Sequence, residues 1–362
     1  MNQPAVEAAE IVLPCTELSG TLPFFTDRLG FRIDSIFPAD DPRVAQISGF
    51  GLRLRLERGP KGDDSLLRLL CRVPPDLASG ATTAPNGTRI QFVAADAPVA
   101  MPPATPTLAV SRIGDGAWHT GRAGMQYRDL VTDRQGGRII ASHIRIPDAG
   151  PVPDYVHFHK IRFQMIYCTK GWVRVVYEDQ GPPFVLGAGD CVLQPPEIRH
   201  RVLESGDGLE VVEIGCPAEH MTCVDHDLML PTGALRPERD FDGQRFVRHE
   251  SAKAVWQPWR LAGFEARDTG IGAATGGIAG ARVVRPDGGT VGGASRHDAD
   301  TLFLFLLQGA LTLGTGERAE ERLGAGDSVL LPARMAHRLA ECSADLELLE
   351  VAMPAGFATE RA

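Results

Sequence analysis

Short runs in which apolar and polar positions alternate predict a chain built mostly of β-strands, and one such run carries histidines. On a strand, side chains alternate faces with a period of two, so His157 and His159 point the same way. Gln164 follows after room for a short turn and takes an inward position on the next strand. His200 follows the apolar strand Cys191–Gln194. Three imidazoles and one amide oxygen inside a small barrel predict a first-row metal site with open coordination positions.

The first part of the chain has a different pattern. Apolar residues at Leu18, Leu22, Phe25 and Leu29 have helical spacing, and Gly30 supplies a stop. Strands are expected before and after this helix, at Glu10–Cys15, Phe31–Phe37, Val44–Ser48 and Leu52–Leu56. Residues 9–57 are therefore predicted to form a β-α-β-β-β unit.

Proline marks the domain boundaries. Residues 96–117 contain several prolines, which favour an extended, semi-rigid chain, and we expect a linker here. Residues 236–258 are polar and rich in charge and are expected to form a second linker. The segments that flank this second linker are copies of each other.

An internal repeat runs through the rest of the chain with an offset of about 138 residues. The paired landmarks are His159 with His297, Gly171 with Gly309, Gly189-Asp190 with Gly326-Asp327, Pro195 with Pro332, and His200 with His337. A constant offset over these landmarks indicates two copies of one fold. We refer to residues 118–235 as the first copy and residues 259–358 as the second copy.

The second copy lacks two of the candidate ligands. Ser295 stands where the first copy has His157, and Leu302 stands where it has Gln164. His297 and His337 remain, and the nearby Asp298 should point away from His297 on a regular strand. We therefore expect one metal per chain, in the first copy only.

The spacing of these residues resembles the two motifs of the cupin family. His157, His159, Gln164 and Gly171 match the first motif, and Gly189, Pro195 and His200 match the second. Gln164 stands where the family usually has Glu, and Glu197 stands where it usually has Gly. The resemblance implies two cupin barrels and metal binding by His157, His159, Gln164 and His200.

The N-terminal segment resembles half of a vicinal-oxygen-chelate, or glyoxalase-like, unit. The resemblance rests on Phe24-Phe25, on Leu29-Gly30-Phe31 and on the turn and strand Pro85–Phe92. It places ligand positions at Glu10 and Glu57, but no histidine occurs before His119, so the usual ligand set is incomplete. A packing, dimerisation or pocket-lid role is the alternative for this segment.

Together these patterns predict a mostly β protein with two cupin double-stranded β-helix barrels after a small α+β domain. The expected order is a glyoxalase-like domain at 1–95, a linker at 96–117, a first cupin at 118–235, a linker at 236–258 and a second cupin at 259–358.

The ligand set indicates the chemistry. Neutral imidazoles and a neutral amide leave the full charge on a divalent transition metal, with Fe(II) favoured and Mn, Ni, Co or Zn as alternatives. Such a centre suits a small, oxygenated, anionic substrate. Because an amide cannot act as a base, the candidate catalytic residues are Glu204, Tyr155 and Arg162, with Arg162 placed to clamp a carboxylate. By analogy with bicupins we favour a dioxygenase-type oxidoreductase; an isomerase and a non-catalytic module that binds or senses a small molecule remain the alternatives.

Composition limits the partners. A formal net charge of −9 argues against nucleic-acid binding. The first residues lack the features of a signal peptide, no apolar run is long enough to cross a membrane, and seven cysteines without Cys-x-x-Cys spacing predict free thiols in a reducing cytoplasm. We expect a cytoplasmic protein with a small-molecule substrate, and a homodimer is left open.

Overall fold

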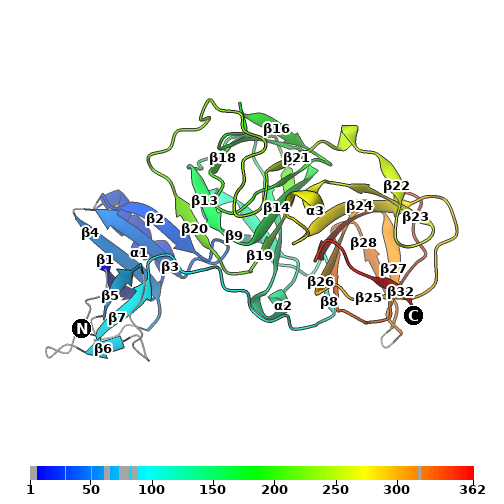
Figure 1. Ribbon diagram of the computed structural model, residues 1–362, viewed down its shortest axis with the longest axis horizontal. Coiled ribbons are helices and arrows are strands. Elements are labelled where there is room, and N and C mark those ends of the chain that lie inside the picture. The colour runs from blue at the N-terminus through cyan, green and yellow to red at the C-terminus, as the bar shows by residue number, and fades with distance from the viewer. Residues whose placement is uncertain are drawn as a thin grey trace. The chain divides into compact units, whose positions relative to one another are not determined.

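The structure is a computed structural model that describes residues 6–28, 30–49, 51–60, 66–72, 81–83, 89–316 and 319–362. These residues form two compact units. One comprises the chain up to Ala100 with two short later segments, His157–Lys160 and Glu219–Asp227, and the other comprises the remainder. Figure 1 draws the chain from blue at its N-terminus to red at its C-terminus.

The first unit has the β-α-β-β-β order that the helical and alternating patterns predict. It begins with β1 (Val6–Cys15), α1 (Leu18–Pro23), the π-helical turn Phe24–Arg28, β2 (Arg32–Phe37), β3 (Val44–Gly49) and β4 (Leu52–Arg58). The strands β5 (Leu66–Cys71), β6 (Ala81–Thr83) and β7 (Arg89–Ala94) follow, and β1 lies between β4 and β5. The helix is shorter than predicted because it changes to a π-helical turn after Pro23. The predicted turn at Asn86-Gly87 lies outside the described residues.

Two later strands extend this sheet. β20 (Met221–Val224) pairs antiparallel with β2, and β13 (His157–Lys160) pairs along its whole length with β20. The strand that carries two of the predicted metal ligands is therefore hydrogen-bonded to β20, which in turn is hydrogen-bonded to a strand from the first forty residues.

The second unit contains two barrels (Figure 1). Their main sheets have the same strand order. The main sheet of the first barrel has the order β21-β17-β14-β19-β11-β10-β9, and that of the second has the order β8-β29-β26-β31-β24-β23-β22. The first comprises β9 (His119–Thr120), β10 (Gln126–Asp129), β11 (Ile140–Ile146), β14 (Phe163–Lys170), β17 (Cys191–Leu193), β19 (Leu209–Cys216) and β21 (Val247–His249). The second comprises β8 (Ala109–Ser111), β22 (Trp256–Pro258), β23 (Phe264–Asp268), β24 (Gly280–Pro286), β26 (Thr301–Gln308), β29 (Ser328–Leu331) and β31 (Glu347–Met353). The predicted repeat is thus a repeat of structure.

Further strands complete each barrel. In the first they comprise β12 (Gly150–Pro151), β15 (Trp172–Tyr177), β16 (Phe184–Gly187) and β18 (His200–Ser205). In the second they comprise β25 (Ser295–His297), β27 (Ala310–Gly314), β28 (Glu321–Gly324), β30 (Arg338–Ala340) and β32 (Thr359–Arg361). The short helices α2 (Arg134–Gly137) and α3 (Ile271–Ala274) occupy corresponding places before β11 and β24.

The two predicted linkers contain strands, which corrects their description as plain connectors. β8 lies in the segment before the first copy but pairs with β29 of the second barrel. β21 lies in the segment before the second copy but pairs with β17 of the first barrel. Each linker therefore completes the main sheet of the barrel that it does not directly precede in the chain.

The barrels share one apolar core. Buried side chains from both, among them Phe163, Tyr167, Phe303 and Phe305, form a single cluster. Two buried arginines also cross between them: Arg128 Nη2 donates to the Gly326 carbonyl at 2.6 Å, and Arg267 Nη2 donates to the Tyr167 hydroxyl at 3.1 Å. These residues occupy corresponding positions in the repeat, so the contact between barrels has an approximate internal symmetry.

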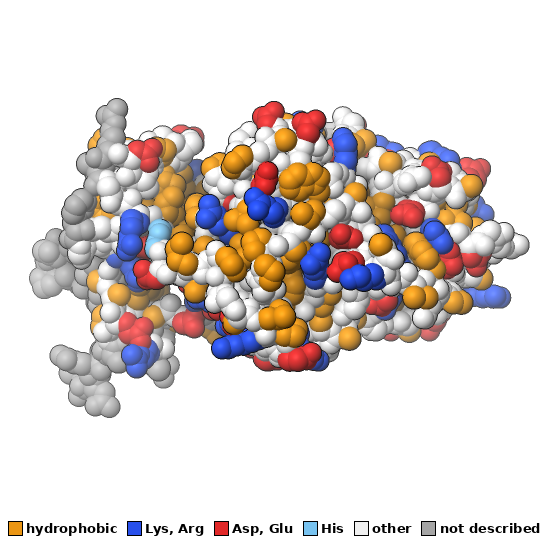
Figure 2. Space-filling model, turned by 90° about the horizontal axis from the view of Figure 1, so that it is seen from above, with side chains coloured by type: hydrophobic (Ala, Val, Ile, Leu, Met, Phe, Trp, Pro, Cys, Tyr) orange, Lys and Arg blue, Asp and Glu red, His pale blue; other side chains and the backbone are white. Residues whose placement is uncertain are grey.

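The surface is mixed in charge. On the face drawn in Figure 2, acidic and basic side chains are interspersed with exposed hydrophobic ones. The cysteines whose side chains are described are free thiols. Within the described ranges, no helix combines the length and the apolar character needed to cross a membrane.

Candidate metal centre

The strand β13 presents two histidines on one face. His157 and His159 are buried, whereas Phe158 and Lys160 between and after them are only partly buried, as the period of two predicts. Candidate ligand atoms of His157, His159 and His200 all lie within 4.8 Å of one another. Among the described residues this is the group of histidine, cysteine and carboxylate side chains with the geometry to hold a metal ion.

A tight corner positions His200. Glu197, which stands where cupins usually have glycine, has a φ of 59°, in the left-handed region that favours glycine. His200 begins β18 and stacks on Tyr177 at 5.5 Å between ring centroids, and its Nδ1 lies 2.9 Å from the Ile198 carbonyl. Nδ1 therefore carries the proton and donates it, which makes Nε2 the ligand atom. Burial lowers the pKa of His200 to about 4, so the imidazole is neutral at pH 7 and its lone pair is available.

The neighbouring strand β20 orients His159. The Thr222 hydroxyl lies 3.0 Å from His159 Nδ1, and Thr222 is directly opposite His159 in the strand pairing. A hydrogen bond to one ring nitrogen fixes the tautomer and the orientation of a ligand histidine. The ring of His220, at the start of the same segment, lies 5.2 Å from that of His159. His220 is buried as well.

Gln164 points to the inside of the first barrel, as predicted. It shares a face of β14 with Cys168, which belongs to the inner apolar cluster. The Gln164 amide nitrogen donates to Glu213 Oε1 at 2.7 Å. With its nitrogen held by a carboxylate, the amide directs its oxygen the other way, as a metal ligand requires. Glu213 was missed in the sequence, although the repeat pairs it with Glu350 and so could have indicated it.

The donor set fits a divalent transition metal. Imidazole nitrogens suit first-row metals, and His200 and His159 each have the second ring nitrogen engaged, as ligand histidines do. His157, His159 and His200 would hold the ion, with the oxygen of Gln164 as a fourth donor.

The three candidate catalytic residues lie in different surroundings. Glu204 forms an ion pair with Arg174 at 2.6 Å, and both side chains are more than a third exposed. Arg162 is exposed, and its backbone is hydrogen-bonded to Cys216 and Gln244. Tyr155 is half-buried, and the buried ion pair of Arg122 with Asp154 lies against it, with the guanidinium 5.8 Å from the ring centre. The catalytic roles of all three stay predictions; of them, Tyr155 has the most enclosed surroundings.

The second copy has the same strands as the first but lacks the group of three histidines. Ser295 and Leu302 are buried at the positions of His157 and Gln164, as the repeat predicts. His297 and His337 lie with their ring centroids 5.7 Å apart. Asp298 is exposed and accepts a hydrogen bond from the backbone of Ala358, so it does point away from His297.

The sequence was compared with protein families and with known proteins. Residues 282–352, in the second copy, match the family described as Cupin domain. A search of curated protein sequences found no match.

Several solved structures share the fold. An oxalate decarboxylase from Lactobacillus farciminis is similar at a TM-score of 0.50 and 15% identity, over 70% of this chain and 88% of that one. A salicylate 1,2-dioxygenase from Pseudaminobacter salicylatoxidans is similar at 0.50 and 14% identity, over 72% and 90%. The protein Ylba from E. coli is similar at 0.51 and 10% identity, over 70% and 93%. At these identities the likeness concerns the fold alone.

Proposed function

We propose that the first copy binds one divalent transition metal, with Fe(II) favoured, and that the chain is a metal-dependent enzyme of the cupin type. The observation that supports this proposal most strongly is the buried cluster of His157, His159 and His200. When bound, such a metal acts as a Lewis acid towards an oxygen ligand and, as Fe(II), supports dioxygen chemistry.

The side chains around the cluster favour an anionic substrate. His200 is neutral, and Gln164 brings no charge of its own. Glu213 is turned towards the Gln164 amide nitrogen, so its charge is partly engaged. The oxalate decarboxylase and the salicylate dioxygenase named above act on carboxylates, which agrees with a small oxygenated anion as substrate. We favour a dioxygenase-type oxidation, and Tyr155 is the candidate to orient the substrate.

Oxygen uptake tests this proposal. The protein is purified without oxygen and reconstituted with Fe(II), and oxygen consumption is followed with a panel of α-keto and hydroxy carboxylates. We expect oxygen uptake with at least one compound in the wild type. The double variant that carries both His157→Ala and His200→Ala should show none. Turnover without oxygen uptake would indicate an isomerase. Tight ligand binding without any turnover would indicate a sensing module and would overturn the enzyme proposal.

For the N-terminal segment we propose a glyoxalase-like unit that supports the centre without binding metal. The β1-α1-β2-β3-β4 order supports the first part of this proposal. The former ligand position Glu10 is buried and accepts hydrogen bonds from Arg68 and Gln46, at 2.9 and 2.8 Å, and Glu57 pairs with Arg55 at 2.9 Å. Metal analysis of Glu10→Gln should therefore give the wild-type metal content, and a lower content would contradict the proposal.

A further inference from the structure

The second copy buries polar atoms that have no partner among the described residues. Ser295 and His297 lie on the same face of β25 and are 4% and 2% exposed. The Ser295 hydroxyl and both ring nitrogens of His297 lack a hydrogen bond of good geometry, although the Leu331 carbonyl lies near enough to one nitrogen to raise the pKa of the ring. A buried polar group that is left without a hydrogen bond lowers the stability of the folded state. An occupant, either water or a ligand, is therefore expected at this place.

A half-buried arginine, Arg260, exerts its charge on these histidines. Arg260 Nη2 donates to Glu350 at 2.5 Å, whereas its Nε and Nη1 are buried with no partner in the part of the chain that the structure describes. Its guanidinium lies over the Trp259 ring at 4.2 Å and over the Phe357 ring at 5.1 Å, which holds it in place. Burial is the main cause that lowers the pKa values of His297 and His337. The charge of Arg260 lowers both further, after that of His337 in the case of His297. The guanidinium is thus a fixed cation whose charge reaches both histidines.

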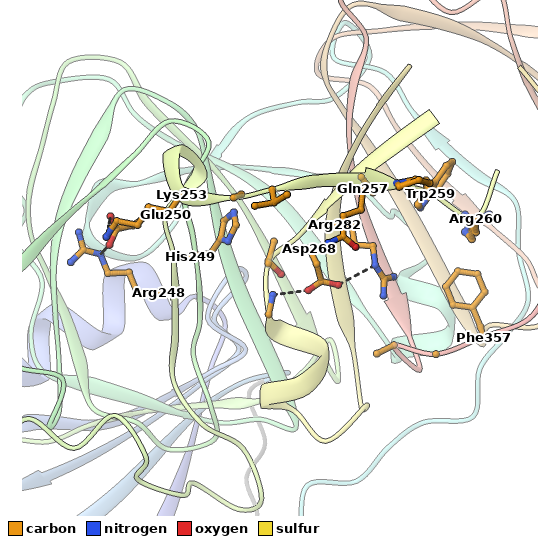
Figure 3. Close-up of a pocket in the computed structure, with 18 residues that line it drawn as sticks. Arg248, His249, Glu250, Lys253, Gln257, Trp259, Arg260, Asp268, Arg282 and Phe357 are labelled. Atoms are coloured by element: carbon orange, nitrogen blue, oxygen red, sulfur yellow. Dashed lines mark hydrogen bonds and ion pairs between the residues drawn. The ribbon is translucent and has the colours of Figure 1, made fainter. Parts of the chain in front are cut away.

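A pocket of about 870 Å³ leads to this arginine (Figure 3). Arg260, Trp259 and Phe357 form one end of its lining, and the Phe357 ring lies 6.0 Å from the ring of His297. Arg282 lines it too, on the inner face of the barrel, because it shares that face of β24 with the core residue Val284. This volume is in the range of small-molecule sites, about 300–1,000 Å³.

The lining favours an anion with an apolar body. Its cations are Arg248, Lys253, Arg260 and Arg282, and its acids are Glu250 and Asp268. Even when the buried Glu350 behind Arg260 is counted, one positive charge remains in excess. Aromatic and aliphatic side chains also line the pocket, among them Trp259, Phe357 and Val255.

We propose that the second copy binds a small organic carboxylate with an aromatic or apolar body, without a metal. Its carboxylate would accept hydrogen bonds from the free N–H groups of Arg260, and its body would lie against Trp259 and Phe357. This inference is independent of the metal centre in the first copy, because it can be tested after that centre has been removed.

Benzoate serves as the probe. Its binding to the metal-free double variant that carries His157→Ala and His200→Ala is measured by calorimetry. We expect one binding site per chain. Benzamide, which has the same shape and no charge, should bind at least about tenfold more weakly, because hydrogen bonds to charged groups are the stronger ones. Equal affinities for the two compounds would overturn the proposal.

Double variants identify the residues that bind benzoate. Arg260→Gln with Glu350→Gln removes the cation without leaving a buried charge unpaired, and we expect benzoate affinity to fall at least about tenfold. His297→Leu with His337→Leu removes the neighbouring donors and should weaken binding several-fold with Arg260 intact. Arg322→Gln is the matched control, since Arg322 is a half-exposed arginine of the same barrel, 52% exposed, and should leave the affinity unchanged.

Circular dichroism of each variant checks that the fold is kept. Benzoate binding that survives loss of Arg260 would place the site elsewhere. Absence of benzoate binding in a folded protein would mean that ordered water alone satisfies the buried groups.

Discussion

The two copies have the same arrangement of strands but differ in the charge of the side chains inside the barrel. The first has neutral donors, and the second has an arginine. In the first, three histidines converge and Gln164 is held by Glu213, so the site is suited to an external metal ion. In the second, Ser295 and Leu302 replace two donors, and Glu350, the counterpart of Glu213, holds Arg260. The comparison teaches that a few inward side chains decide whether the same barrel frame offers a cluster suited to a metal ion or carries a guanidinium of its own.

The backbone does not explain this difference. Arg334, the counterpart of Glu197, also has a left-handed φ, 66° against 59°. His337 Nδ1 lies 3.1 Å from the carbonyl two residues before it, as His200 Nδ1 does at 2.9 Å. The corner that positions this histidine is thus preserved in both copies, and the loss of ligands lies in side chains on the other strands.

The largest expected effect comes from making the first copy resemble the second. Gln164→Leu removes the fourth donor and leaves Glu213 without its amide partner. Metal affinity should fall about a hundredfold, the upper end of what loss of a supporting partner costs. Competition with a chromophoric chelator measures it. The reciprocal change Leu302→Gln is the control, and a wild-type affinity in Gln164→Leu would show that the amide is no ligand.

Loss of the hydrogen bond from Thr222 should have a smaller effect. Thr222→Val keeps the shape of the side chain but no longer holds His159 Nδ1. Metal affinity should fall about tenfold. Thr222→Ser keeps the hydroxyl and should retain most of the affinity. If the valine and serine variants bind metal equally well, the hydroxyl does not orient the ligand.

Gln164→Glu should keep the metal and change its pH dependence. The new carboxyl group would lie about as far from Glu213 as the amide does now, 2.7 Å. Two carboxylates this close share a proton, which raises the pKa of one of them. Metal binding should therefore weaken on acidification at a higher pH than in the wild type. Superimposable profiles of metal affinity against pH would contradict this expectation.

The smallest effect concerns stability in acid. Burial, with further contributions from neighbouring charges, lowers the pKa values of His143 and His297 to about 4, below the usual 6.5. Between these values the unfolded chain binds protons that the folded chain does not. The stabilisation is therefore complete above about pH 6.5 and is lost as the pH falls towards 4.

Thermal unfolding of the metal-free protein should show this loss. The Tm should fall by several degrees between pH 7 and pH 5, and less in His143→Gln. A Tm that stays constant or rises on acidification would contradict the assignment.

The order of the strands and the two-copy organisation could be predicted from the sequence because they depend on local patterns and on the repeat. The period of two placed His157 and His159 on one buried face, and the constant offset identified two barrels of one strand order. The β-α-β-β-β order of the N-terminal segment followed from helical spacing and a glycine stop.

What could not be predicted depends on contacts between distant segments. Thr222 reaches His159 only because β20 pairs with β13, and nothing near either residue indicates that pairing. The strands β8 and β21 lie in proline-rich or charged segments and form only against a barrel elsewhere in the chain. The ion pair of Arg260 with Glu350 joins residues 90 positions apart, and no local pattern around either residue indicates it.

Metal counting in two paired variants tests the central claim most directly. Wild-type protein, His157→Ala with His200→Ala, and His297→Ala with His337→Ala are purified without oxygen, loaded with Fe(II), and measured by elemental analysis. The account predicts about one metal per chain in the wild type, none in the first pair, and about one in the second pair. Two metals in the wild type, or loss of metal only in the second pair, would contradict the assignment of the metal to the first copy and of the guanidinium to the second.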